Sequence, residues 1–339
     1  MREISNFVGI NIVLNINPCA HDCRYCFFDN HKNSKLPISR FLAIIERFLD
    51  WKQSCRRKKF DISFVLFHSD DYDLATTKRM IELRSRNKSN MQLFLGGLRM
   101  RSEKEMRIWL QERQKLGIRN VVASFLGHGA VHDSWNGRPG DFDFLMSTLK
   151  IAAELGMEME QRLFLIKSTL PHMEELIDKL DMLPNKVRKR SVCPLDYSGR
   201  ADKLEAERLT EADLKHLPER VSRFLTAVRS EREWIEFIRQ REDPPRKKGV
   251  LKFYLDDTNI DRIEAMSCDA IVAELEQRVR TAYAALPTQR ELCEACGDSN
   301  STLLYSFWSE LERKWLDKYL EQHPIQFERE ITMLGMYRE

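Results

Sequence analysis

Apolar and polar positions along the first two thirds of the chain alternate in a way that predicts strands and helices in turn. Residues 9–17 alternate as a strand does, and residues 60–67 become continuously apolar, as in a strand covered on both faces. Between them, residues 38–51 place their apolar side chains on one helical face. The pattern repeats, and we predict six strands at residues 9–17, 60–67, 91–97, 120–126, 158–167 and 190–197.

Six strand–helix units in succession predict a parallel sheet with helices outside it. We therefore expect an α/β fold, a partial (β/α)6 TIM-like barrel over residues 1–202 that is open on one side. Residues 203–249 are dense in charge with helical spacing and end in a proline-containing linker. Residues 250–339 are predicted to form a mainly helical C-terminal extension, with a candidate short strand at 250–255 and helices at 270–286 and 302–322.

Three cysteines lie close together just after the first predicted strand. Cys19 and Cys23 are separated by three residues, and Cys23 and Cys26 by two. An odd number of cysteines with such short gaps does not suit unstrained disulfides. A tetrahedral zinc site would need a fourth protein ligand, for which His21 is the nearest candidate. An iron–sulfur cube held by three cysteines would instead leave one iron without a protein ligand.

This Cys-x3-Cys-x2-Cys spacing, with Tyr25 directly before the last cysteine, resembles the signature of the radical S-adenosylmethionine (SAM) superfamily, in its MoaA-like and peptide-modifying branch. The resemblance implies an enzyme in which Cys19, Cys23 and Cys26 ligate a [4Fe-4S] cluster and SAM binds the open iron. Reduction then splits SAM to methionine and a 5′-deoxyadenosyl radical, which abstracts hydrogen from a substrate. An electron donor of the flavodoxin or ferredoxin type is implied as a partner.

The resemblance also assigns SAM contacts after the second strand. The family usually has a Gly-Gly-Glu-like turn there, whereas this chain has the polar run His68, Ser69, Asp70 and Asp71. These residues are a candidate substitute that would receive the SAM amino group. The same run also reads as a turn in which Asp71 or Asp73 caps the following helix.

A second set of candidate contacts follows the fourth strand, in residues 127–143, which resemble a loop of the family. There an His-Asp pair precedes an arginine and a glycine, matching His132, Asp133, Arg138 and Gly140. Ser124 and Arg138 occupy the positions that contact the SAM carboxylate and ribose in relatives. The alternative is that Asp133 caps a turn and Arg138 pairs with Asp141 or Asp143 on the surface.

The last candidate contacts lie on the fifth and sixth strands. Arg162 is the polar side chain of the fifth strand that we expect to meet SAM or substrate, unless alternation places it in solvent. Leu195 lies near the end of the sixth strand, before the run Ser198 to Ala201, and the family places this backbone beside the SAM adenine.

The composition of the chain limits the classes of binding partner that we expect. The 339 residues carry 55 basic and 52 acidic side chains, and a net charge of +3 gives no reason to expect nucleic acid. No apolar run approaches the roughly 20 residues that span a bilayer, and the first nine residues lack a signal-peptide core. We expect a cytoplasmic protein with no membrane partner, because reduced cysteines survive there.

The substrate is left open by the sequence. The loop after the fourth strand and the Ser-Gly-Arg-Ala run favour relatives that modify a ribosomal peptide or a natural-product or cofactor precursor. An RNA- or protein-modifying enzyme is the alternative, and a zinc-stabilised binding module is the alternative from another class. Cys55 and Cys193 are expected to be buried small hydrophobic residues. Whether Cys268, Cys293 and Cys296 hold an auxiliary cluster stays open, and we expect little or no iron there.

Overall fold

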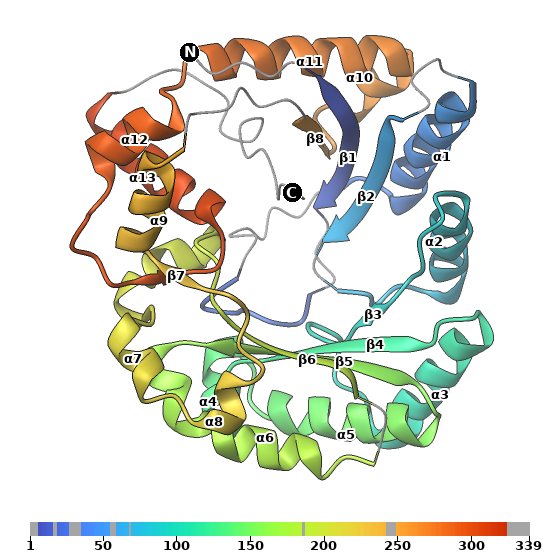
Figure 1. The fold of residues 1–339 in the computed structure, drawn as a ribbon. Helices are drawn as coiled ribbons and strands as arrows, with labels where there is room; N and C mark the ends of the chain where they lie inside the picture. Colours follow the sequence, from blue (N-terminus) through green and yellow to red (C-terminus); the bar gives the residue numbers. More distant parts are fainter. Residues whose placement is uncertain are drawn as a thin grey trace.

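The computed structural model describes residues 6–15, 19–26, 35–54, 59–67, 69–184, 187–241 and 249–323. Figure 1 shows two parallel sheets inside a ring of helices. One sheet has the strand order β2-β1-β8 and the other has the order β3-β4-β5-β6. The strands are β1 (Phe7–Asn15), β2 (Asp61–Phe67), β3 (Leu93–Phe94), β4 (Asn120–Phe125), β5 (Glu158–Leu165), β6 (Val187–Pro194) and β8 (Gly249–Leu255).

Helices cover the outer face of both sheets. Phe41, Ile45 and Phe48 are fully buried at helical spacing, so α1 turns one apolar face to the core. A capping box at Ser102 starts α3, because it satisfies two amide groups at the helix start. These outer helices are α1 (Ile38–Ser54), α2 (Leu74–Arg86), α3 (Glu103–Lys115), α5 (Asp141–Glu154), α6 (Met173–Asp181), α10 (Ile260–Ala265) and α11 (Cys268–Ala284).

The strands have one apolar face toward the helices and a more polar face toward the interior. In β5, Leu163 and Leu165 are fully buried in the core, whereas Arg162 on the opposite face is only half-buried. Arg162 lies in register with Ser124 of β4 and with Ser191 of β6. Because residues in register share a face of the sheet, these polar side chains gather inside the barrel.

Strand β8 comes from the region predicted to be mainly helical. It corresponds to the candidate strand at residues 250–255, and it pairs in parallel with β1 from Phe7 to Leu14. The α/β barrel-like architecture is confirmed, but the described strands of the two parallel sheets number seven rather than six. The domain boundaries at residues 202 and 249 stay a prediction.

Two other predictions need correction. The run 127–143, read as a loop, contains the helix α4 (Gly129–Asn136). The four glycines of this run indicated a loop rather than a helix. One of them, Gly137, ends the helix in the left-handed conformation. The predicted helix 302–322 begins with a strand, β9 (Leu304–Tyr305), and only then becomes α13 (Trp308–Gln322).

Helices α9 (Glu231–Arg239), α12 (Gln289–Cys296) and α13 form a second hydrophobic cluster beside the barrel. Trp234, Ile235, Leu311 and Trp315 pack together there, with the buried carboxylate of Glu231 accepting from Lys314 and from the Trp315 indole. Among the described helices, none combines the length and apolarity that a bilayer crossing needs. The remaining elements are η1 (Lys167–His172), η2 (Gly199–Lys203), η3 (Glu205–Glu207), α7 (Glu211–Lys215), α8 (Glu219–Ser222) and β7 (Arg229–Ser230).

Candidate functional site

The cysteine loop, residues 19–26, follows the C-terminal end of β1 and is held by backbone hydrogen bonds from three sides. The amide of Ala20 donates to the carbonyl of Gly97 at 2.9 Å. The amides of Asp22 and Arg24 donate to the end of α4, at 3.1 and 2.9 Å. The amide of Arg200 in η2 donates to the carbonyl of Cys26 at 2.9 Å. The loop therefore sits at the strand ends where α/β barrels place their chemistry.

All three cysteines of the loop are free thiols and partly buried. Burial raises the pKa of the Cys23 thiol well above its ordinary value, and the neighbouring Cys19 and Cys26 raise it further. Burial also raises the pKa of Cys19, against a hydrogen bond from the His21 backbone. The neutral form of Cys19 and Cys23 is therefore favoured, and a metal would have to displace their protons.

Three thiols on one short loop are the donor set that an iron–sulfur cluster takes. In the part of the chain that is described, no group of three or more His, Cys, Asp or Glu side chains is already arranged around a metal position. The residues fit the cluster by their chemistry, since sulfur is the ligand that iron–sulfur clusters require. His21 Nε2 does not belong to this set, because it lies against Asp141 and Gly97 instead.

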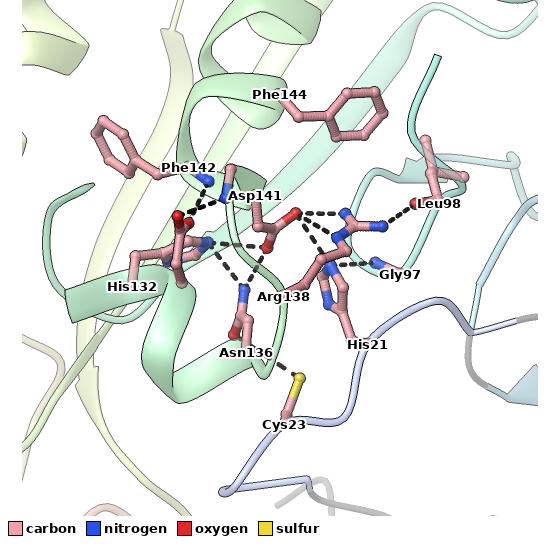
Figure 2. A network of polar contacts seen from close by, with 12 residues as sticks. His21, Cys23, Gly97, Leu98, His132, Asn136, Arg138, Asp141, Phe142 and Phe144 are labelled. Carbon is pink, nitrogen blue, oxygen red and sulfur yellow. Dashed lines mark hydrogen bonds and ion pairs between the residues drawn. The ribbon is translucent and has the colours of Figure 1, made fainter. Parts of the chain in front are cut away.

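Asp141 is the centre of a buried polar network under the loop (Figure 2). Its carboxylate is completely buried and lies within 3.1 Å of Nε2 of both His21 and His132. Asn136 Nδ2 donates to it at 2.6 Å, and the Arg138 guanidinium forms an ion pair with it. Although burial acts to raise the pKa of Asp141, these partners hold it well below its usual range.

The hydrogen bonds of His132 define its tautomer. Its Nδ1 accepts from the backbone amide of Leu126 at 3.1 Å, so this nitrogen carries no proton. The proton of the neutral ring is then on Nε2, where it is donated to Asp141. His21 is less constrained: with a proton on Nε2 it donates to Asp141, and without one it accepts from the Gly97 amide at 3.3 Å.

Asn136 carries the network to the cysteines. Because its NH2 group faces Asp141, its oxygen Oδ1 must face the loop. That oxygen accepts from the Tyr25 hydroxyl at 2.6 Å and lies 3.7 Å from the Cys23 sulfur. The aromatic residue of the motif is thus fixed by α4. Its ring also packs near Phe164 of β5, with centroids 6.0 Å apart.

Arg138 and Asp133 follow the alternative that we gave for them. Arg138 pairs with Asp141 and donates to the Leu98 carbonyl, but this pair is buried rather than on the surface. Asp133 accepts from the amides of Gly140 and Phe142 at 2.6 and 2.8 Å, and so caps the start of α5. Contact of Arg138 with SAM stays a prediction.

The run after β2 is structured by its two aspartates. His68 lies outside the described residues. Ser69 accepts from the Asp71 amide at 3.2 Å, and Asp70 accepts from the Phe94 amide at 2.7 Å. Asp71 pairs with Arg99 and Arg101, and Asp73 rather than Asp71 caps α2. Asp70 therefore ties this turn to β3 and Asp71 ties it to the segment after β3, and their contact with SAM stays a prediction.

Arg162 and Ser124 face the barrel interior from neighbouring strands. The Arg162 guanidinium is held by Glu160 at 2.8 Å and lies over the Phe94 ring, with 38% of the side chain exposed. It therefore lies on the interior face of the sheet and stays partly exposed to solvent. Contact of Arg162 and Ser124 with SAM stays a prediction.

Leu195 is buried beside the cysteine loop, in a small cluster that also contains Leu126, Trp135, Ile166 and Ala201. Tyr25 packs against the same cluster. A cavity of about 10 Å³ opens there, room for about one water molecule. The cluster that contains Leu195 therefore supports the position of Tyr25, and the place of Leu195 beside an adenine stays a prediction.

The other cysteines do not gather into one group. Cys268 starts α11 and belongs to the main core, whereas Cys293 belongs to the second cluster, with Cys296 packed against it. Cys193 lies on β6, and Cys55 is outside the described residues. Among the cysteines that are described, those three of the C-terminal region are thus divided between two cores.

Sequence reasoning missed the residues that hold the loop. Asp141 was considered only as a partner of Arg138, and His21 only as a zinc ligand. Asn136 and Arg200 were assigned no role, yet Arg200 also binds the Asp22 carboxylate at 2.6 Å. The contacts of these residues with the cysteine loop join positions more than 100 residues apart in sequence. No local sequence pattern predicts such contacts.

No protein-family model matches the chain, and no curated protein matches it. Among solved structures, the chain is similar to SuiB of Streptococcus suis bound to S-adenosylmethionine, with 16% identity, a TM-score of 0.43 and coverage of 74% of this chain and 51% of that one. It is similar to coproporphyrinogen III oxidase (HemN) from Escherichia coli, described as a radical SAM enzyme, with 13% identity, a TM-score of 0.40 and coverage of 69% and 53%. It is also similar to anSMEcpe with bound AdoMet, with 14% identity, a TM-score of 0.39 and coverage of 54% and 51%. The chain thus spans about half the length of these structures. One of these three structures, HemN, is described as a member of the family that the cysteine motif resembles.

Proposed function

We propose that this chain is a radical SAM enzyme in which Cys19, Cys23 and Cys26 hold a [4Fe-4S] cluster. SAM is its cosubstrate or cofactor, and a flavodoxin- or ferredoxin-like protein is its electron donor. The substrate is a ribosomal peptide or a natural-product or cofactor precursor, from which hydrogen is abstracted. One observation carries the proposal: three free thiols lie on one loop at the C-terminal end of a parallel barrel strand.

The bound cluster would supply one electron that cleaves SAM to methionine and a 5′-deoxyadenosyl radical. The chain itself provides the surroundings for this chemistry. It anchors the cysteine loop through Gly97, the end of α4 and η2. It also directs polar groups into the barrel next to the loop, chief among them the Arg162 guanidinium, a good partner for a carboxylate.

The contacts of His21 leave only one ring nitrogen, Nδ1, for a zinc site. A closed zinc site would need a fourth ligand, and His21 was the nearest candidate. The His21 side chain is only 5% exposed, and its Nε2 is bound within the Asp141 network. Three thiols suit a cluster that keeps one iron open to a small molecule.

The substrate class rests on the sequence resemblance alone. The Ser-Gly-Arg-Ala run predicted to end the barrel forms η2, and Arg200 within it binds the cysteine loop. A peptide offered to the purified enzyme should increase turnover of SAM if this assignment is right. An RNA that does so instead would support the alternative substrate class.

Anaerobic purification and reconstitution with iron and sulfide test the central claim. We expect about four irons per chain, as a single [4Fe-4S] cluster requires, and formation of 5′-deoxyadenosine from SAM and dithionite. The variant with Cys19, Cys23 and Cys26 all changed to Ala should lose both. Cys268→Ala, a matched control in the core at the start of α11, should keep both. Colourless protein that holds stoichiometric zinc would overturn the proposal in favour of a zinc-stabilised module.

A further inference from the structure

One buried carboxylate collects side chains from three segments of the chain. On one oxygen of Asp141 converge the Arg138 guanidinium and His21 Nε2, the latter at 3.1 Å. On the other converge His132 Nε2 at 3.1 Å and Asn136 Nδ2 at 2.6 Å. Figure 2 shows that these groups surround Asp141 and that the cysteine loop lies directly beyond them.

Two of these partners reach the cysteine loop. His21 is itself a residue of the loop, between Cys19 and Cys23. Asn136 presents its oxygen to the Tyr25 hydroxyl and to the Cys23 sulfur. The orientation of that amide is decided by Asp141, because the NH2 group must face the carboxylate. Asp141 therefore determines that Asn136 presents its oxygen, rather than its NH2 group, to the cysteine loop. In sequence, Asp141 lies 115 residues after Cys26, the last cysteine of that loop.

We propose that Asp141 is a positioning residue for the metal site: it fixes His21 and Asn136, and through them the shape of the cysteine loop. This proposal rests on the proposed function where it concerns the cluster. Where it concerns the shape of the loop, it applies equally to the protein without metal.

Only a carboxylate suits this position. Its two oxygens offer about four acceptor sites, whereas the single oxygen of an amide offers two. Asp141→Asn keeps the size of the side chain but turns an NH2 group toward donors. In one orientation of the new amide its NH2 group faces the donors on His132 and Asn136, and in the other it faces the Arg138 guanidinium. We expect the loop to open more often, because a buried polar group left without its partner is costly.

The first measurement is made on metal-free protein. Under native conditions, the rate at which a thiol reagent labels Cys19, Cys23 and Cys26 is followed by peptide mass spectrometry. We expect Asp141→Asn to label these cysteines about tenfold faster or more, since labelling reports local opening. Asp143→Asn is the matched control, an exposed aspartate two residues away in the same helix turn, and it should label at the wild-type rate.

The second measurement is made after reconstitution. We expect Asp141→Asn to bind less iron, and the clusters that form should give an electron paramagnetic resonance spectrum different from wild type after reduction. A purely structural role would lower the yield of folded protein without changing the spectrum per iron. Asp143→Asn should reproduce the wild-type spectrum.

If Asp141→Asn does not fold, His21→Ala serves as a second variant. It removes the side chain by which the loop contacts Asp141, and it should also increase the rate of cysteine labelling. Wild-type labelling rates in both Asp141→Asn and His21→Ala would overturn the inference. Failure of the wild type to bind iron would refute the proposed function instead, and the labelling comparison would still decide the role of Asp141.

Discussion

Asp70 and Asp71 are neighbours whose substitution should change stability in opposite directions. Burial raises the pKa of Asp70 from 3.8 to about 6, against the Phe94 amide and the more distant Arg84 and Arg113. Burial also acts on Asp71, but its ion pairs with Arg101 and Arg99 prevail and lower its pKa. The charged form is therefore unfavourable at Asp70 and favourable at Asp71.

The magnitude for Asp70 follows from its pKa. A rise of about two pH units, at about 1.4 kcal/mol for each, gives about 3 kcal/mol of lost stability when the group is charged. Below pH 3.8 both folded and unfolded chains hold the proton, so Asp70 contributes nothing there. Between that pH and about 6 the folded chain binds more protons, so its stability falls as pH rises. Above about 6 the whole penalty is present.

Urea unfolding of the wild type, Asp70→Asn and Asp71→Asn at pH 5 and pH 8 measures both effects. The asparagine at position 70 can still accept from the Phe94 amide, so only the charge is removed. We expect Asp70→Asn to raise the free energy of unfolding by about 3 kcal/mol at pH 8 and by less at pH 5. Asp71→Asn should lower it by about 1 to 3 kcal/mol at pH 8, because it breaks charged hydrogen bonds. Equal destabilisation by both substitutions at pH 8 would refute the reasoning.

Two further substitutions act on the segment that follows α4. Gly137 has φ of +65°, and an added Cβ would lie 2.6 Å from the Asp22 carbonyl oxygen of the cysteine loop, so Gly137→Ala should destabilise the chain and reduce iron binding. Gly156→Ala is its control, since φ there is +71° and no atom lies within 4 Å of an added Cβ. Equal loss of iron in both variants would show that the contact of residue 137 with the loop is irrelevant. Arg138→Ala leaves the buried Asp141 carboxylate without its cation and should cost about 3 kcal/mol in thermal unfolding, besides weakening SAM turnover. Unchanged stability would mean that this ion pair does not form.

Local patterns predicted what depends on neighbours in sequence. The helix expected at residues 38–51 is found as α1, because its apolar spacing is a local signal. The fourth strand was expected at 120–126 and is found at Asn120–Phe125. The strand at Leu304–Tyr305 was read as helix, since a short apolar run fits both periods.

The candidate site was predicted only in its motif. Cys19, Cys23, Cys26 and Tyr25 were found because their spacing is a local signal. The Asp141 network was not, because its contacts depend on how the segment after β4 docks against the loop after β1. Helix α4 was missed for a related reason: its glycines favour turns locally, and its burial against the loop is a tertiary effect.

The pairing of β8 with β1 has a consequence for how the polypeptide acquires its structure. The first strand gains one of its two neighbours only when residues more than 230 positions later have been synthesised. Until then its outer edge is unpaired and apolar, a site at which nascent chains can associate with one another. We therefore expect a recombinant fragment that ends near residue 202 to precipitate. The full-length chain, in which β8 pairs with β1, should stay in solution under the same conditions.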